Sequence, residues 1–299
     1  MTTTLPPAKD DLGHYLSVMV AHGASDLFLS AGTPAAVKVQ GVVMRLAEAD
    51  LSPAATQQLA YSMMREAQIK RFEATMECDF AIAMEGLGRF RVNVYRQRGD
   101  VAVVVRHISG KIPSIEALGL PPIVKSLAQL KRGLVLVVGA AGSGKSTTLA
   151  SMIDHRNHTV GGHILTVEDP MEFEHAHAKA IVDQREVGLD TQSFDEALRH
   201  AMREAPDVIM IGEIRDRDTM QHAMAYAETG HLCVSTLHAN NANQAIQRIL
   251  NFFPETAHKQ ILMDLSLNLK GVVGQRLIRG VADKLVPAVE VMLLSPYIA

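Results

Sequence analysis

The stretch LVLVVGAAGSGKST constrains the fold more than any other part of the chain. Its five apolar residues at 134–138 form the kind of run that a buried strand needs. The following residues satisfy the pattern G-x-x-x-x-G-K-[ST] through Gly139, Gly144, Lys145 and Ser146. The sequence therefore predicts a strand, a glycine-rich loop, and a helix that begins where the loop ends.

A loop of this pattern turns its backbone N–H groups toward a phosphate, and the positive end of the following helix adds to the attraction. Lys145 is expected to reach the β- and γ-phosphates, and the Ser146 hydroxyl to ligate Mg²⁺. The alternative is a glycine-rich turn that binds nothing. We predict a site for ATP and Mg²⁺ whose loop residues are Gly139, Ala140, Ala141, Gly142, Ser143, Gly144, Lys145, Ser146 and Thr147.

The segment ILTVEDPMEF ends a predicted strand with three acids, Glu168, Asp169 and Glu172. Ligands of open α/β sheets bind at the carboxyl ends of the strands, where a carboxylate can polarise an attacking water. Clustered acids also raise one another's pKa, which favours a general base. A solvated loop with a turn at Asp169-Pro170 is an equally good interpretation of this segment taken alone.

The segment PDVIMIGEIRD has the layout of a Walker B strand, with Glu213 where an aspartate usually holds Mg²⁺ through water. Glu213 is therefore predicted to support the metal. Arg215 and Arg217 follow closely. For these arginines we favour surface ion pairs with Asp216 or Asp218 over a catalytic role.

The segment ETGHLCVSTLHANN places His231 and His238 at the two ends of a predicted strand. Seven extended residues separate them by about 23 Å, so the two cannot bind one ion. A histidine in a strand is most often a packing residue. His238, which leaves the sheet beside the predicted phosphate loop, is the better candidate for contact with a γ-phosphate.

The 299 residues favour two domains. Residues 1–109 show the pattern of a small α+β domain, and proline and small residues in KIPSIEALGLPP place a linker at 110–122. From 123 to 299, alternating strands and helices predict a parallel sheet covered on both faces. The strands expected in this α/β domain lie at 134–138, 163–167, 208–211 and 231–236.

In residues 1–109, shorter patterns predict the individual elements. The expected order is a helix at 11–23, two strands within 25–46, a helix from 52 to about 74, and three strands within 78–108.

The formal net charge of −3 argues against nucleic acid as the main partner, because proteins that neutralise phosphates usually carry a basic excess. The two cysteines, Cys78 and Cys233, are typical of buried thiols in a reducing compartment. The start of the chain lacks a signal-peptide pattern, and no apolar run approaches the roughly 18 residues of a membrane span. We expect a cytoplasmic protein.

Taken in order, GAAGSGKSTT, TVEDPME, VIMIGEIRD and ETGHLCVSTLHANN resemble the Walker A, Asp box, Walker B and His box of the secretion ATPase superfamily. ASDLFLSAGTPAAVKVQG and VDQREVGLDTQSFDEALRHAMREAPDVIMIGEIRDRDTM resemble the type IV pilus retraction ATPases, the PilT and PilU proteins. The resemblance spans nearly the whole chain. LHANNANQAIQRILNFFP is more similar to PilU, because PilT usually has threonine and serine after the His-box LH.

The resemblance implies a hexameric ring in which each subunit has a PAS-like N-terminal domain and a RecA-like ATPase domain. It implies that Lys145 and Ser146 bind phosphate and Mg²⁺ and that Glu172 activates water. Glu213 would support Mg²⁺, and His231 and His238 would be the paired histidines of the family. Arginines of RFRVNVYRQR, among them Arg91, and Arg106 are expected phosphate contacts from the N-terminal domain.

The resemblance also implies a function and partners. The expected function is ATP-driven pilus retraction in twitching motility. The expected partners are a PilT-like ATPase and the pilus platform protein, which would hold the motor at the cytoplasmic side of the inner membrane. A pilus assembly or secretion motor and a nucleotide-dependent binding module are the alternatives, although assembly motors often carry four zinc-binding cysteines and this chain has two. Family members usually continue through further helices, so we expect those helices to be missing here.

Overall fold

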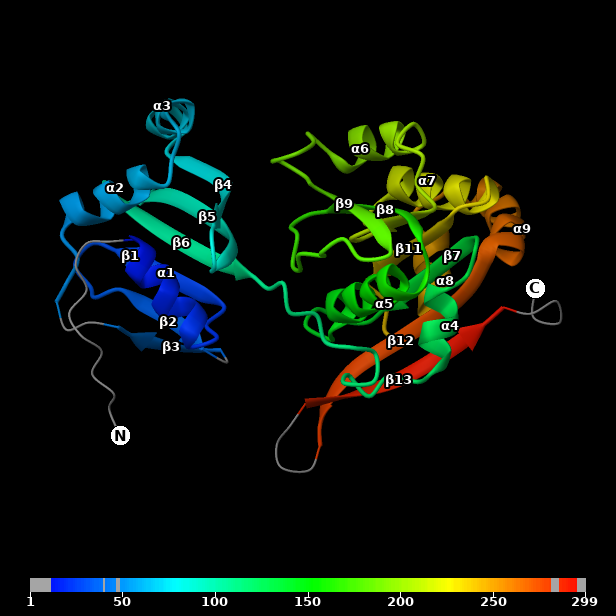
Figure 1. Ribbon diagram of the computed structural model, residues 1–299. Helices are drawn as coiled ribbons and strands as arrows, with labels where there is room; N and C mark the ends of the chain where they lie inside the picture. Colours follow the sequence, from blue (N-terminus) through cyan, green and yellow to red (C-terminus); the bar gives the residue numbers. More distant parts are fainter. Residues whose placement is uncertain (1–11, 40, 47–48, 281–284, 295–299) are drawn as a thin grey trace. The chain divides into compact units, whose positions relative to one another are not determined.

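The computed structural model (Figure 1) describes residues 12–39, 41–46, 49–280 and 285–294. Contacts divide the chain into two compact units, Met1–Ser109 and Gly110–Ala299. Within the described residues, none of the helices is both long enough and apolar enough to cross a membrane.

The first unit is built on an antiparallel sheet with the strand order β3-β2-β1-β6-β5-β4. Buried side chains of its three helices, such as Leu16 and Phe72, contribute to its core. Its elements are α1 (Leu12–Ala21), β1 (Asp26–Ser30), β2 (Ala36–Val39), β3 (Val42–Arg45), α2 (Pro53–Ser62), α3 (Glu66–Thr75), β4 (Glu77–Met84), β5 (Gly88–Gln97) and β6 (Asp100–Ile108).

The three strands expected within 78–108 are confirmed, but two other predictions for this unit were wrong in detail. The segment 25–46 forms three strands, because Gly41 takes a φ of 84° and permits a second tight turn. The helix expected from 52 to about 74 is two helices. The first helix ends at Ser62, and Arg65, whose backbone is extended (φ −76°, ψ 157°), is the N-cap of the second.

The second unit has a seven-stranded sheet in the order β13-β12-β7-β11-β10-β8-β9. All neighbouring strands run parallel except β12 and the edge strand β13, which are antiparallel. The elements are α4 (Ile123–Ala128), β7 (Gly133–Val138), α5 (Lys145–Thr159), β8 (Gly162–Glu168), β9 (Ala180–Glu186), α6 (Phe194–Ala201), β10 (Val208–Ile211), α7 (Arg217–Glu228), β11 (Leu232–Leu237), α8 (Ala242–Leu250), a short 3₁₀ helix (Glu255–Ala257), α9 (His258–Asn268), β12 (Leu269–Arg279) and β13 (Leu285–Leu293).

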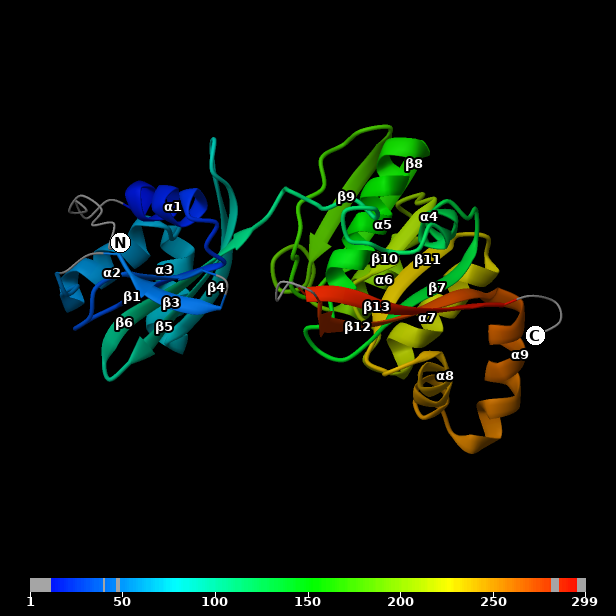
Figure 2. The same ribbon diagram turned by 90° about the horizontal axis from the view of Figure 1, so that it is seen from below.

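The four strands predicted for this unit are confirmed, and side chains of the sheet pack on both faces. Along β7, Leu134 and Leu136 join a core with α6, α7, α8 and α9, whereas Val135 and Val137 join a core with α4 and α5. Figure 2 shows α5 and α8 on opposite sides of the sheet. A strand buried on both faces reads as a continuous apolar run, which is why β7 was recognisable in the sequence.

The parallel strands bring four loops to one edge of the sheet. The glycine-rich loop follows β7, the acidic segment follows β8, Glu213 follows β10, and His238 follows β11. Because β7, β11, β10 and β8 are consecutive neighbours, their carboxyl ends meet at this edge, which is where ligands of open α/β sheets bind.

Candidate nucleotide-binding site

A cavity of about 210 Å³ lies at this edge of the second unit. Its lining includes loop residues, acids from two other strands and a histidine from a third: Ala141, Gly142, Lys145, Ser146, Glu172, Glu213 and His238. Side chains that lie up to about 100 positions apart in the sequence therefore line one cavity.

The glycine-rich loop can form only because its glycines have no side chain. Gly142 and Gly144 have left-handed backbone, with φ of 73° and 85°. A Cβ atom at Gly139 would clash with the Ser143 hydroxyl and lie 2.5 Å from the carbonyl oxygen of Gln275. Each of these glycines is therefore required by the local backbone, whatever the loop binds.

Lys145 is the first residue of α5, and its side chain is nearly buried, with 8% of the residue exposed. Its Nζ donates a hydrogen bond to the carbonyl oxygen of Ala140 at 2.9 Å. Burial lowers the pKa of this amine, while the nearby carboxylates Glu213 and Glu172 act in the opposite direction. An ammonium group held at a helix N-terminus in a cavity is well suited to bind an anion.

The remaining loop residues surround the cavity without all facing it. Gly139 and Ala140 line a neighbouring groove that also contacts His238. Ser143, Gly144 and Thr147 are not in the cavity lining. Of the nine loop residues expected at the site, four therefore line the cavity itself: Ala141, Gly142, Lys145 and Ser146.

Glu168 at the end of β8, and Asp169 and Glu172 in the segment that follows, all line the cavity. Glu172 is exposed and accepts a hydrogen bond from the Ser146 hydroxyl at 3.1 Å. Glu168 is buried and accepts from Thr166 Oγ1 at 2.7 Å and from Gln184 Nε2 at 3.1 Å. Burial raises the pKa of Glu168 to about 7, and the charge of Glu172 is the smallest contribution. The nearby acid therefore raises this pKa, as expected for clustered acids, but burial is the largest cause.

Glu213 contacts the side chains of His238 and Arg215. Its Oε1 lies 3.0 Å from His238 Nε2, and its Oε2 accepts from Arg215 Nε at 3.1 Å. Arg215 also donates to Asp169 Oδ2 at 3.2 Å, and the hydrogen bond to Glu213 is the largest cause of its raised pKa. Polar contacts among Asp169, Arg215, Glu213 and His238 thus connect the loops after β8, β10 and β11.

The ion pair expected for Arg215 exists, but the predicted partners were wrong. The carboxylate of Asp216 caps α7 by accepting from the backbone N–H of Thr219 at 2.9 Å. Arg217 lies over the ring of Phe253, 5.8 Å from its centroid. The prediction from sequence neighbours was wrong because the Asp216 carboxylate caps α7, and Arg215 pairs with Glu213 and Asp169 instead.

His231 is not in the cavity lining. It precedes β11, at the opposite end of that strand from His238, and its Nδ1 contacts Thr229 Oγ1 at 3.1 Å and the Tyr226 carbonyl oxygen at 3.3 Å. The two histidines therefore do not share a site within one chain, in agreement with the distance argument.

The two arginines proposed as phosphate contacts belong to the first unit. Arg91 on β5 lies opposite Arg106 on β6 in the strand register, so both side chains project from the same face of the sheet. Arg106 Nε donates to Asp26 Oδ1 at 2.8 Å, although 59% of the arginine side chain stays exposed.

Three residues of the site carry no motif signal. His175 lines the cavity, is 7% exposed, and has a pKa lowered to about 4 by burial. Gln184 on β9 donates to Glu168 and to the Phe173 carbonyl oxygen, and accepts from the His175 N–H. Gln275 on β12 contacts the glycine-rich loop from behind. Only the fold brings these residues to the loops, so no local pattern could have identified them.

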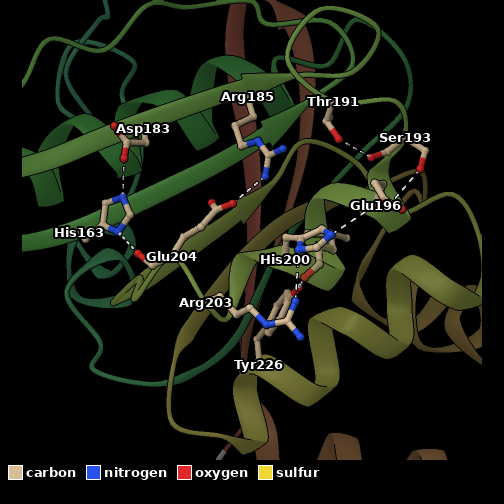
Figure 3. Close-up of polar contacts among 11 residues, drawn as sticks. His163, Asp183, Arg185, Thr191, Ser193, Glu196, His200, Arg203, Glu204 and Tyr226 are labelled. Atoms are coloured by element: carbon tan, nitrogen blue, oxygen red, sulfur yellow. Dashed lines mark hydrogen bonds and ion pairs between the residues drawn. The ribbon is translucent and has the colours of Figure 1, made fainter.

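A second group of polar contacts in this unit lies outside the cavity. Figure 3 shows His163 between Asp183 and Glu204, with Arg185 on the Glu204 carboxylate. None of the residues labelled in Figure 3 lines the cavity. This network joins β8, β9 and the segment after α6.

Comparison with known proteins places this geometry in a family. The family model described as "Type II/IV secretion system protein" matches residues 4–290. The chain belongs to this family. The type IV pilus ATPase PilU of Pseudomonas aeruginosa is 54% identical over 285 residues, which cover 95% of this chain and 75% of PilU. The retraction ATPase PilT of the same organism is 43% identical, over 96% of this chain and 84% of PilT.

Solved structures of this family have a similar fold. A crystal structure of the pilus retraction motor PilT with bound ADP matches with a TM-score of 0.89 and 44% identity, over 96% of this chain and 84% of that one. The ATPase DotB of Legionella pneumophila matches with a TM-score of 0.81 and 26% identity, over 96% and 81%. The predicted membership of the secretion ATPase superfamily and the greater similarity to PilU than to PilT are confirmed.

Proposed function

We propose that this chain is an ATP-hydrolysing motor that powers or assists retraction of the type IV pilus. One observation carries the proposal: Lys145, Ser146, Glu172 and Glu213, from three different loops, line a single cavity beside a glycine-rich loop. A phosphate-binding lysine, a hydroxyl and two carboxylates are the groups that hydrolysis of a nucleoside triphosphate requires.

The residues present fit ATP and Mg²⁺. The β- and γ-phosphates would be held by the glycine-rich loop and by the buried amine of Lys145. The loop has no room for a Cβ at Gly139. The Ser146 hydroxyl would ligate Mg²⁺ and Glu213 would support it through water. This agrees with the preference of Mg²⁺ for few protein ligands together with substrate phosphates. The ion would neutralise charge on the phosphates.

Glu172 is the proposed general base. Its carboxylate would accept a proton from the attacking water as the new bond to the γ-phosphorus forms and the bond to the ADP oxygen breaks. Glu172 accepts from the Ser146 hydroxyl, which has lone pairs left to bind Mg²⁺, so the base would lie beside the metal ligand. His238, which contacts Glu213, would face the γ-phosphate from the end of β11.

The family resemblance supports a finer assignment of domains and assembly. Residues 1–109 would form a PAS-like domain, 110–122 the linker, and 123–299 a RecA-like ATPase domain. Six chains would form a ring, and His231 would belong to the paired histidines of the family. Arg91 and Arg106 would complete the triphosphate site, because charge developing in the transition state generally requires arginine.

The cellular role follows the most similar named relatives. The difference between 54% identity to PilU and 43% to PilT supports a PilU-like role beside a PilT-type ATPase. The motor would act at the cytoplasmic side of the inner membrane, on the pilus platform protein. With two cysteines the chain cannot supply a four-cysteine zinc site, which argues against the assembly and secretion branch.

Deletion of the gene in a piliated bacterium tests this role, with pilus number and twitching as readouts. Excess surface pili with reduced twitching would support retraction. Loss of surface pili would contradict it and favour an assembly motor. In vitro, we expect ATPase activity per chain to rise with protein concentration until rings are complete and to be insensitive to DNA. Strong stimulation by DNA would instead indicate a translocase.

A further inference from the structure

We propose that Gln275 is a positioning residue of the phosphate-binding loop, whose side-chain amide fixes the direction of the peptide between Ser143 and Gly144. The inference rests on the proposed function, because it assumes that the loop binds the phosphates of a nucleotide. It assigns a role to a residue outside the four motif segments.

The strand register places Gln275 directly behind the loop. β12 runs parallel to β7, and their last paired residues are Gly274 and Val138. β7 ends at Val138 and is followed by Gly139, the first glycine of the loop, whereas β12 continues with Gln275. The loop therefore rests on the backbone of β12, and a Cβ at Gly139 would lie only 2.5 Å from the Gln275 carbonyl oxygen.

The Gln275 side chain is buried, with 4% of the residue exposed, and both ends of its amide are bonded. Nε2 donates to the Ser143 carbonyl oxygen at 2.9 Å, and Oε1 accepts from Thr148 Oγ1 at 2.7 Å. A carbonyl oxygen can only accept, so the NH₂ group must face Ser143. Thr148 is fully buried in the first turns of α5, so one amide ties the loop to the helix that follows it.

This contact sets the direction of a backbone N–H group of the loop. The Ser143–Gly144 peptide is trans, so its C=O and N–H groups point in opposite directions. Because the Ser143 C=O points at the Gln275 amide, the Gly144 N–H points away from that amide. Backbone N–H groups of this loop are the groups that bind phosphate in the proposed site.

Without the clamp, the glycine would permit other directions. Gly144 has a φ of 85°, and glycine also adopts negative φ at little cost. The Ser143 C=O could then turn toward the cavity, where it would repel a phosphate oxygen instead of attracting it. Gln275 therefore preorganises the loop, and its loss should weaken nucleotide binding more than it slows the chemical step.

The test uses Gln275→Met, which keeps the length of the side chain and removes both hydrogen bonds. Asn157→Leu is the matched control, because Asn157 is also fully buried and uses its amide twice, donating to the Ala176 carbonyl oxygen at 2.7 Å and accepting from the Ala178 N–H at 3.2 Å. Calorimetry measures the dissociation constant of ADP with Mg²⁺ on the full chain, thermal unfolding reports stability, and steady-state kinetics separate KM from kcat.

We expect Gln275→Met to raise the dissociation constant and KM about tenfold or more, with a smaller change in kcat, the size expected for one misdirected phosphate contact. Asn157→Leu should lower stability and leave ADP binding unchanged. A folded Gln275→Met protein that binds ADP like the wild type overturns the inference, as does an equal loss in both variants. A wild-type chain that binds no nucleotide overturns the proposed function as well.

Gln275→Glu gives a second, independent reading if the methionine variant does not fold. A carboxylate keeps the acceptor for Thr148 but cannot donate to Ser143, whereas a protonated carboxyl can do both. Burial raises the pKa of such a group. ADP binding by this variant, relative to wild type at the same pH, should therefore recover as the pH falls from 8 to 6. A ratio that does not change with pH would overturn the inference.

Discussion

At the scale of single residues, Lys145 and Glu168 are ionisable side chains buried at the same cavity. Burial disfavours the charged form in both, so it lowers the pKa of the amine and raises that of the carboxyl to about 7. Neighbouring groups oppose burial in both cases. Hydrogen bonds from Thr166 and Gln184 favour the Glu168 carboxylate, and the charges of Glu213 and Glu172 favour the Lys145 ammonium. An anion bound at the loop would favour the charged form of Lys145.

The raised pKa of Glu168 predicts a pH-dependent cost to stability. Below its ordinary value of 4.5 the carboxyl is protonated in both states. Between about 4.5 and 7 it ionises in the unfolded state but stays protonated in the folded state, so the free energy of unfolding falls as the pH rises through this window. Glu168→Gln should therefore raise the free energy of unfolding by about 2 kcal/mol more at pH 8 than at pH 5. Urea unfolding of both proteins at the two pH values measures this. A difference that is equal at both pH values would contradict it.

Glu172→Gln should keep nucleotide affinity and lose about 10² to 10⁴ in turnover, the usual effect of removing a positioned base. Glu174→Gln is the matched control, because Glu174 is exposed two residues later and is not in the cavity lining. Steady-state ATPase rates and the dissociation constant of ADP are the measurements. Weak binding with normal turnover of bound ATP would show that the base lies elsewhere.

At the scale of the elements, the start of α7 depends on Asp216 rather than on Arg215. Asp216→Ala should lower the free energy of unfolding by about 1 kcal/mol, because it removes the N-cap hydrogen bond to Thr219. Asp218→Ala, in the first turn of the same helix, is the control and should cost less. Urea unfolding compares the two variants. An equal loss in both would show that charge near the helix end matters more than the cap.

The elements predicted from the sequence are those whose evidence is local. β7, β8, β10 and β11 are buried on both faces and appear as apolar runs, and the glycine-rich loop follows a known spacing. Glu172, Glu213 and His238 were placed near the loop because parallel strands bring their carboxyl ends together. Cavity-lining side chains that follow directly after apolar strands were therefore predictable.

The elements that were missed depend on contacts distant in sequence. β9 lies at one edge of its sheet and reads AIVDQRE, with too many polar residues for a clear strand pattern. β12 contains Gly271, Gly274 and the polar Gln275, which lower its apparent strand propensity. Because β9 carries Gln184 and β12 carries Gln275, the residues that support the site were missed together with their strands.

At the scale of the whole molecule, the proposed division of labour between the two units predicts the behaviour of residues 110–299 alone. If arginines of the first unit complete the site, this fragment should bind ATP but hydrolyse it at least about tenfold more slowly than the full chain. Circular dichroism and thermal unfolding establish that the fragment is folded before ATPase rates are compared. A folded fragment as fast as the full chain would exclude the first unit from catalysis.

The central claim is that the cavity at the carboxyl edge of the second sheet binds and hydrolyses ATP, and Lys145→Ala tests it most directly. Replacing the buried amine removes the cation that meets the β- and γ-phosphates, so we expect ATP turnover to fall to background. Lys259→Ala, at an exposed position of α9, is the control and should keep the wild-type rate. A steady-state ATPase assay of the three proteins, with thermal unfolding to confirm that each is folded, gives the answer. A folded Lys145→Ala protein with near-normal hydrolysis would contradict the account.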